Sequence, residues 1–204
     1  MNITEYIAKQ FSKPTGFFGN ISTFLMNNMN KVQYDSVINN INCIAQDRIL
    51  DIGFGNGYLI NLLAKKNKSD FYGIEISEDM INVASKRNSR YIENNKMHLL
   101  SGSADNMPFK EDFFDKIYTV NTIYFWPDLD KGLQEVKRVL KKDGIFINAI
   151  YSKEWLNKLK YTEYGFSKYT PDEFKQAINR NGLEVIKVIE TKKDTSYCII
   201  SKKN

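Results

Sequence analysis

The chain has 204 residues, 42% of them hydrophobic and 26% charged, which is the size and balance of one globular domain. Its longest apolar runs, such as Ile145–Ile147, are much shorter than the 18 or more residues that cross a membrane, and no secretion signal is recognisable at its start. Cys43, Cys198 and the only histidine, His98, are far apart. We therefore expect no metal site, no Ser-His-Asp triad and a reducing, cytoplasmic location.

The net charge of +5 comes from lysine rather than arginine. The chain has 24 lysines and five arginines, and many of the lysines form short pairs near the ends of expected elements. Arginine is the residue that recognises phosphates and guanines through two hydrogen bonds at once. We therefore expect a solvated, lysine-rich surface, and a nucleic-acid partner is disfavoured.

Residues 1–45 have the pattern of two or three helices around a break at 13–16. These helices are expected at Ile3–Phe11, Ile21–Met29 and Tyr34–Ala45. We interpret this segment as an N-terminal helical cap on a domain that spans 46–204.

From residue 46 onward, apolar runs typical of buried strands alternate with amphipathic helical patterns. The expected elements in chain order are a strand at 48–52, a helix at 58–66, a strand at 71–76, a helix capped by Ser77, strands at 97–101 and 116–120, a helix at 128–140, a turn at 142–144 and a strand at 145–150. A capped helix then opens at Thr170–Glu173 and ends at Gly182, before a hairpin of strands at 183–190 and 196–201.

This alternation predicts an α/β fold with a Rossmann-like, seven-stranded, mostly parallel sheet. We expect helices on both faces of the sheet, an antiparallel strand from the final hairpin, and an N-terminal helical lid. Residues 151–169 form an aromatic-rich insertion that is expected to belong to the lid. Ligands of such sheets bind at the carboxyl ends of the strands.

A glycine-rich turn follows the first of these strands, at Asp51–Gly57. Its three alternate glycines allow a close approach of the backbone to a ligand, and Glu75 ends the next strand about 20 residues later, where a carboxylate can bind both hydroxyls of a ribose. Tyr58 stands where the dinucleotide fingerprint needs glycine or alanine, and Asp51 would repel a diphosphate. The site therefore suits a nucleoside that carries a cation or an amine.

At this point the chain resembles a known family, the class I S-adenosylmethionine-dependent methyltransferases. The segments that carry the resemblance cover roughly residues 45–150 and are Ile49–Gly57, Gly73–Ser77, Gly102–Phe109, Phe114–Ile117, Asn121–Trp126 and Val139–Gly144. The resemblance implies S-adenosylmethionine as cofactor. It also implies a set of cofactor-binding residues: Asp51, Gly53 and Gly55 at the methionine end, Glu75 at the ribose, Ile76 and Met80 on the adenine face, Ser103 and Ala104 at the adenine edge, and Asn121 near the amino group.

Two of these assignments have an alternative. Many relatives carry an aspartate where this chain has Ser103, whose hydroxyl is a weaker acceptor, and Asp105 could replace it. Ile76 and Met80 could instead be ordinary core residues.

The acceptor side of the site is rich in aromatic residues. Phe18, Tyr124 and Trp126 are the candidate substrate-binding residues, although packing of helices onto the sheet would also explain aromatic side chains there. No catalytic residue is recognisable, and methyl transfer mainly requires alignment and exclusion of water. We expect a methyltransferase that acts on a small molecule. The alternatives are a macromolecule or a lipid headgroup docked on the lysine-rich surface, or a protein that binds the cofactor without catalysis.

Overall fold

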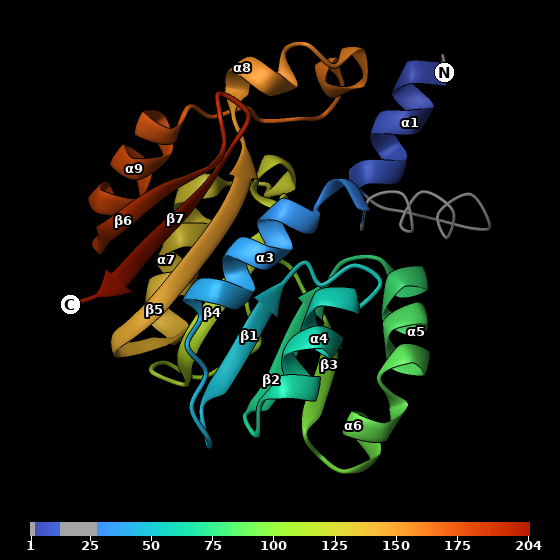
Figure 1. The fold of residues 1–204 in the computed structure, drawn as a ribbon, viewed down its shortest axis with the longest axis vertical. Coiled ribbons are helices and arrows are strands. Elements are labelled where there is room, and N and C mark those ends of the chain that lie inside the picture. Colours follow the sequence, from blue (N-terminus) through green and yellow to red (C-terminus); the bar gives the residue numbers. More distant parts are fainter. Residues whose placement is uncertain (1–2, 13–27) are drawn as a thin grey trace.

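The computed structural model describes residues 3–12 and 28–204, and Figure 1 shows them arranged around one twisted sheet. The sheet has seven strands in the order β3-β2-β1-β4-β5-β7-β6. Their bounds are β1 Arg48–Ile52, β2 Asp70–Glu75, β3 Met97–Ser101, β4 Phe114–Val120, β5 Leu140–Tyr151, β6 Leu183–Lys192 and β7 Ser196–Lys203. All neighbouring pairs from β3 to β5 are parallel, whereas β7 runs antiparallel to both β5 and β6. The predicted fold class is confirmed.

Helices cover both faces of this sheet because successive residues of each buried strand point to opposite sides. Ile49 of β1 packs in a core with α3 and α4, and Leu50 packs in a second core with α7 and α9. In Figure 1, α3 and α4 lie in front of the sheet and α7 lies behind it. The described helices are α1 Ile3–Ser12, α3 Lys31–Asn40, α4 Tyr58–Lys66, α5 Glu78–Arg87, α6 Ser89–Glu93, α7 Leu129–Val139, α8 Lys153–Leu156 and α9 Pro171–Arg180, with short 3-10 turns η1 Ile123–Phe125 and η2 Lys160–Glu163.

Helix starts follow the predicted capping chemistry. The Ser77 hydroxyl accepts a hydrogen bond from the Met80 backbone N–H at the start of α5. Thr170 and Glu173 form a reciprocal capping box at the start of α9, with Pro171 in the first turn. Each cap satisfies backbone N–H groups that a helix cannot pair internally, which explains why these starts could be predicted.

Some predicted bounds were wrong. The helix expected at Tyr34–Ala45 is α3, which begins earlier and ends at Asn40, before Asn42 turns the chain with a φ of 44°. The turn expected at 142–144 lies inside β5, where the pairing with β4 shifts register and Asp143 has a φ of 61°. Short helices α6 and α8 were not predicted. The expected helix Ile21–Met29 lies outside the described residues except for its last two positions.

None of the helices within residues 3–12 and 28–204 has both the length and the hydrophobicity that a bilayer crossing requires.

Candidate functional site

A cavity of about 180 Å³ lies at the carboxyl ends of β1, β2 and β4, and we call it the main cavity. It is where ligands of open parallel sheets bind. Its walls come from the loops that follow four strands and from the N-terminal elements. The lining residues are Phe11, Asn30, Tyr34, Asp51–Asn56, Leu59, Ile74–Ile76, Gly102–Ala104, Val120–Thr122 and Phe125–Pro127.

The glycine turn shapes the floor of this cavity. Gly53, Gly55 and Gly57 have φ angles of +75°, +52° and +70°, which L side chains rarely adopt. A Cβ atom on Gly53 would lie 2.5 Å from the Thr122 side chain, whereas a Cβ atom on Gly55 would meet no atom within 4 Å. Gly55 is therefore the position at which the bare backbone borders open space rather than a packed neighbour.

Glu75 links this turn to the end of β2. Its carboxylate accepts hydrogen bonds from the backbone N–H groups of Gly55 at 3.0 Å, Ile76 at 2.8 Å and Ser77 at 3.0 Å. The side chain is 8% exposed, and the residue lines the main cavity. The backbone thus holds a carboxylate at a defined place beside the glycine turn.

Asp51 is a buried carboxyl group at the end of β1, with 4% of its surface exposed. Burial raises its pKa from 3.8 to about 8; the Tyr118 hydroxyl opposes this rise, and the charge of Glu75 adds to it. Among the described side chains no lysine or arginine forms an ion pair with Asp51. A ligand with a cationic end would compensate this buried acid.

Asn121 follows β4 and has a left-handed backbone, with a φ of 57°. Its Nδ2 donates to the Asn30 Oδ1 at 2.9 Å, and its Oδ1 accepts from the Tyr124 hydroxyl at 3.1 Å. A non-glycine residue in this conformation costs about 1–3 kcal/mol unless its surroundings hold it there, and such residues concentrate at functional sites. The amide connects the N-terminal segment, through Asn30, to the loop after β4.

Trp126 lines the main cavity beside Thr122. Its indole N–H donates to the Thr122 hydroxyl at 3.2 Å, and the residue is 7% exposed. Gly132 of α7 lies directly behind the ring, because a Cβ atom there would be 2.3 Å from a ring carbon of Trp126. The indole can occupy this position only because residue 132 has no side chain.

A second, smaller space of about 40 Å³, which we call the aromatic cavity, adjoins the main cavity. Both cavities are lined by Phe11, Asn30, Asn121 and Phe125. The remaining lining residues of the aromatic cavity are Met29, Tyr124, Tyr151, Leu156, Tyr161 and Phe166.

Two segments far apart in sequence meet over this cavity. Phe11 of α1 stacks on Tyr161 of η2 with ring centroids 4.7 Å apart and planes within 4° of parallel. Figure 1 shows α1 beside the segment that contains α8 and η2. The N-terminal helix and the insertion at 151–169 therefore lie together at the carboxyl end of the sheet, as the lid hypothesis requires.

The structure brings most of the expected site residues together. Eight of the nine expected cofactor-binding residues line the main cavity, namely Asp51, Gly53, Gly55, Glu75, Ile76, Ser103, Ala104 and Asn121. Met80, by contrast, is 1% exposed and does not line the cavity. Ser103 donates its hydroxyl hydrogen to Asp105, so these two side chains act as a pair. The roles of all these residues in cofactor binding remain predictions.

The expected substrate-binding residues are divided between the two spaces. Trp126 lines the main cavity and Tyr124 the aromatic cavity, whereas Phe18 lies outside the described residues. Sequence reasoning did not identify Asn30, Tyr34 or Phe11 as site residues. No motif surrounds them, and the only available signal was the abundance of aromatic residues in the N-terminal segment.

The strand order, the antiparallel β7 and the glycine turn after β1 define a Rossmann-like methyltransferase fold. A family model described as a methyltransferase domain matches residues 50–148. The uncharacterized methyltransferase YdaC of Bacillus subtilis (strain 168) is 31% identical over 125 residues, which cover 61% of this chain and 67% of YdaC. The chain belongs to the class I S-adenosylmethionine-dependent methyltransferase family.

Solved structures show the same fold at low sequence identity. A putative methyltransferase in complex with the Haloferax volcanii Trm112 methyltransferase activator matches with a TM-score of 0.76 and 18% identity, over 87% of this chain and 90% of that chain. Geranyl diphosphate C-methyltransferase from Streptomyces coelicolor A3(2), solved with Mg²⁺, geranyl diphosphate and S-adenosyl-L-homocysteine, matches with a TM-score of 0.74 and 12% identity, over 85% of this chain and 77% of that chain. These likenesses concern the fold.

Proposed function

We propose that the protein binds S-adenosylmethionine in the main cavity and transfers its methyl group to a small molecule in the aromatic cavity. The observation that carries the proposal is the shared wall of the two spaces, formed by Phe11, Asn30, Asn121 and Phe125. Because the same four residues border both spaces, a methyl donor in the main cavity and an acceptor in the aromatic cavity would be neighbours, and direct transfer requires that no side chain stand between the methyl carbon and the attacking atom.

The residues of the main cavity fit the proposed cofactor. Glu75 is a fixed carboxylate that can accept bonds from ribose hydroxyls, and Gly55 leaves open space beside it. Asp51 is a buried acid whose raised pKa reflects the lack of a compensating cation, so it suits an amino group or a sulfonium. Ile76 and Ala104 supply apolar surface for a flat base.

Methyl transfer requires little from the protein beyond the correct placement of the two reactants. When bound, the cofactor supplies a methyl group attached to a positively charged sulfur, which is a good leaving group. The described residues would bind both reactants, hold the acceptor in line behind the methyl group and exclude water. No cluster of three or more metal-ligating side chains occurs within residues 3–12 and 28–204.

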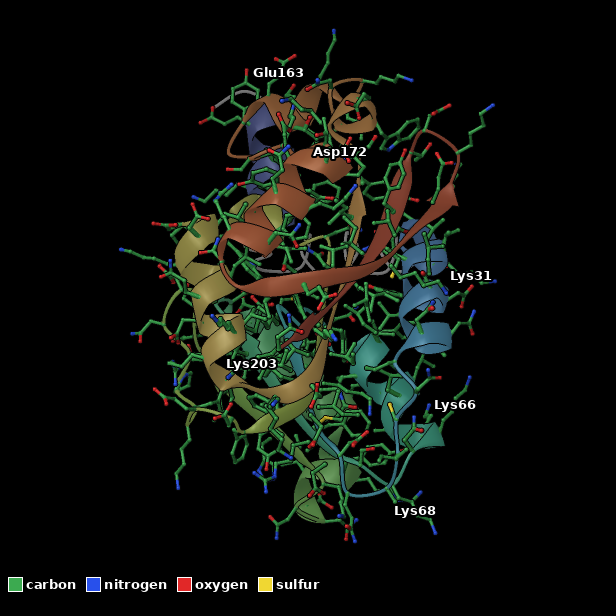
Figure 2. The ribbon with its side chains drawn as sticks, turned by 90° about the vertical axis from the view of Figure 1, so that its left-hand side faces the viewer. Lys31, Lys66, Lys68, Glu163, Asp172 and Lys203 are labelled. Carbon is green, nitrogen blue, oxygen red and sulfur yellow. The ribbon has the colours of Figure 1, made fainter. Side chains whose placement is uncertain are left out.

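A small acceptor fits the site better than a macromolecule docked on lysines. Within the part of the chain that the structure describes, no lysine or arginine lines either cavity. In Figure 2, Lys66 and Lys68 lie at the end of the molecule opposite to Glu163, which belongs to the segment over the aromatic cavity, and the four lysines of that segment (Lys153, Lys158, Lys160 and Lys168) line neither cavity. The two free cysteines, Cys43 and Cys198, are consistent with the cytoplasmic location that we include in the proposal.

Ligand-dependent stability tests the cofactor part of this proposal. At 100 times its dissociation constant, S-adenosylhomocysteine should stabilise the fold by about 2.7 kcal/mol, which raises the melting temperature by roughly 5–10 °C for a domain of this size. NAD serves as the control ligand and should produce no shift. A shift with NAD and none with S-adenosylhomocysteine or S-adenosylmethionine would refute the proposal. A shift without methylation of any compound in a metabolite pool would favour a binding protein.

A further inference from the structure

We propose that the methyl acceptor is an uncharged, mainly apolar molecule that reacts through a lone pair on nitrogen or sulfur and needs no base from this protein. This inference rests on the proposed function and concerns the chemistry of the aromatic cavity. It follows from the neutral, mostly aromatic side chains that line this cavity and from the absence of acidic and basic side chains among its described lining residues.

Among the described residues, the aromatic cavity has no group that could accept a proton at neutral pH. Its described lining contains no aspartate, glutamate, histidine, cysteine, lysine or arginine. The ionisable groups in it are the hydroxyls of Tyr124, Tyr151 and Tyr161, and burial raises the pKa of each above the usual value of 10. These hydroxyls are therefore neutral and serve as poor bases.

Most polar side chains of this cavity already bind neighbouring groups. The Asn121 side chain is bonded to Asn30 on one side and to the Tyr124 hydroxyl on the other, and the Tyr151 hydroxyl donates to the Met29 carbonyl at 3.0 Å. An anionic acceptor would lose its hydration without gaining a partner of opposite charge, and a protonated amine has no lone pair with which to attack. The cavity therefore favours a neutral acceptor with few hydrogen-bonding groups.

The acidic residues and the histidine nearest in function among the described residues lie outside the aromatic cavity. Asp51 and Glu75 line the main cavity but not the aromatic one, and three backbone N–H groups hold Glu75. His98 stacks on Tyr72 with ring centroids 4.8 Å apart, near the amino end of β3 and away from the site. The stretch 13–27, which lies outside the described residues, contains no Asp, Glu, His, Cys or Tyr, and its one ionisable side chain is Lys13.

These properties of the aromatic cavity limit which kinds of nucleophile can be methylated there. A hydroxyl or carbon acid must lose a proton for efficient methylation, which calls for a positioned base. A neutral amine, an aromatic ring nitrogen or a thioether attacks with an existing lone pair. That pair forms the new bond to the methyl carbon, the bond from carbon to the cofactor sulfur breaks, and its electrons remain on that sulfur. Any proton on the methylated nitrogen leaves to water after release.

The aromatic walls suit the charge that this reaction creates. Methylation of a neutral nitrogen or sulfur moves the positive charge from the cofactor to the acceptor. The ring of Phe166 lies 4.6 Å from Phe125 and 5.9 Å from Tyr124, so several ring faces and edges surround the cavity. Aromatic faces attract cations, and this attraction strengthens away from water. The same walls that offer an anionic acceptor no partner can thus stabilise the positive charge that develops during transfer.

Matched acceptors test the inference. Purified full-length protein is incubated with methyl-labelled S-adenosylmethionine and either pyridine, quinoline, methyl phenyl sulfide, phenol or 1-naphthol, and S-adenosylhomocysteine binding is measured on the same sample. We expect label in the nitrogen or sulfur acceptors and none in the phenols. Preferential labelling of the phenols, or no labelling of any nitrogen or sulfur acceptor by protein that binds S-adenosylhomocysteine, would overturn the inference. If the protein does not bind S-adenosylhomocysteine, the result would instead refute the proposed function.

A variant pair tests the role of the walls. Phe166→Leu keeps an apolar side chain but removes a ring from the aromatic cavity, whereas Tyr164→Leu removes a ring from the same segment outside both cavities. A cation–π contribution of about 1 kcal/mol corresponds to an approximately five-fold fall in kcat/KM for the nitrogen acceptor in the Phe166 variant alone. Affinity for S-adenosylhomocysteine should stay unchanged in both variants. Equal kcat/KM values in the two variants would contradict this part of the inference.

Discussion

At the scale of single residues, Gly55 and Gly165 form a natural matched pair. Both have a positive φ, +52° and +69°, and a Cβ atom on either would meet no atom within 4 Å. They differ in surroundings, because only Gly55 lines the main cavity. A comparison of substitutions at the two glycines therefore separates the backbone strain that a side chain causes from its effect on ligand binding.

We expect Gly55→Ala and Gly165→Ala to destabilise the fold by a similar amount, about 1 kcal/mol each, because alanine is strained in a left-handed backbone. Only Gly55→Ala should also weaken cofactor binding, by about tenfold or more, since its methyl group projects into the cavity. Urea unfolding measures the first effect and calorimetric titration with S-adenosylhomocysteine measures the second. Unchanged affinity in Gly55→Ala would place the cofactor elsewhere.

Glu75 allows a second residue-scale prediction. Glu75→Gln keeps the size of the side chain and one oxygen acceptor for the backbone N–H groups, but it removes the charge. If the carboxylate binds the ribose, the variant should lose about 1.5–3 kcal/mol of binding free energy, which is typical for hydrogen bonds to a charged group. Glu78→Gln, in the exposed first turn of α5, provides the control. Equal affinity of the two variants for S-adenosylhomocysteine would exclude this role for Glu75.

At the scale of elements, α1 and the insertion 151–169 meet through aromatic rings. Phe11 stacks on Tyr161, and its ring lies 6.4 Å from that of Phe166. Lids are segments that open locally at a small cost in free energy, and both segments lie over the aromatic cavity.

We therefore predict that S-adenosylhomocysteine slows amide hydrogen exchange in residues 3–12 and 151–169 more than in β1 or β4. Tyr161→Leu should remove most of this extra protection and reduce methyl transfer, because the stack that joins the two segments is lost. Its affinity for S-adenosylhomocysteine should remain within about two-fold, since Tyr161 does not line the main cavity. Strong, equal protection of both segments with and without ligand would show a rigid scaffold and end the lid hypothesis.

The success of sequence reasoning also varied by element. Strands β1 and β3 and helix α4 have the predicted bounds, because a short buried run or a complete amphipathic face ends where its local chemistry changes. The glycine turn and the position of Glu75 at the end of the next strand could be predicted because a local sequence pattern encodes each, whereas their roles in cofactor binding stay predictions. Asn30 and Phe11 could not, because they reach the site only through tertiary packing of α1 and α3. The left-handed backbone of Asn121 likewise depends on partners 91 and three residues away.

At the scale of the whole molecule, Asp51 makes stability depend on pH. Its pKa is about 8 in the folded state and about 3.8 in the unfolded chain, so the folded state binds the extra proton between these values. Stability from this group is fully present below about pH 4 and is lost as the pH rises to about 8. The direction is opposite to that of a carboxylate stabilised by an ion pair.

Asp51→Asn should remove this dependence. We expect the variant to be more stable than the unmodified protein at pH 8–9 and to differ little from it near pH 4, because the buried charge is then absent in both. The difference between the two proteins cancels other titrating groups, so urea unfolding at each pH isolates the contribution of Asp51. A constant difference across this pH range would show that Asp51 is ionised in the folded state throughout.

Gly132 limits which substitutions the protein can accept in α7. Glycine within a helix costs about 1 kcal/mol relative to alanine, so a search for stabilising substitutions would select α7 as a place to improve. Any side chain there would meet the Trp126 ring and push it toward the main cavity. Overpacking of this kind costs about 1–3 kcal/mol, which exceeds the gain in helix propensity, so thermal stability and an open cavity both require glycine at this position. A variant library scored on melting temperature alone would therefore keep residue 132 as glycine, although this residue lines neither cavity.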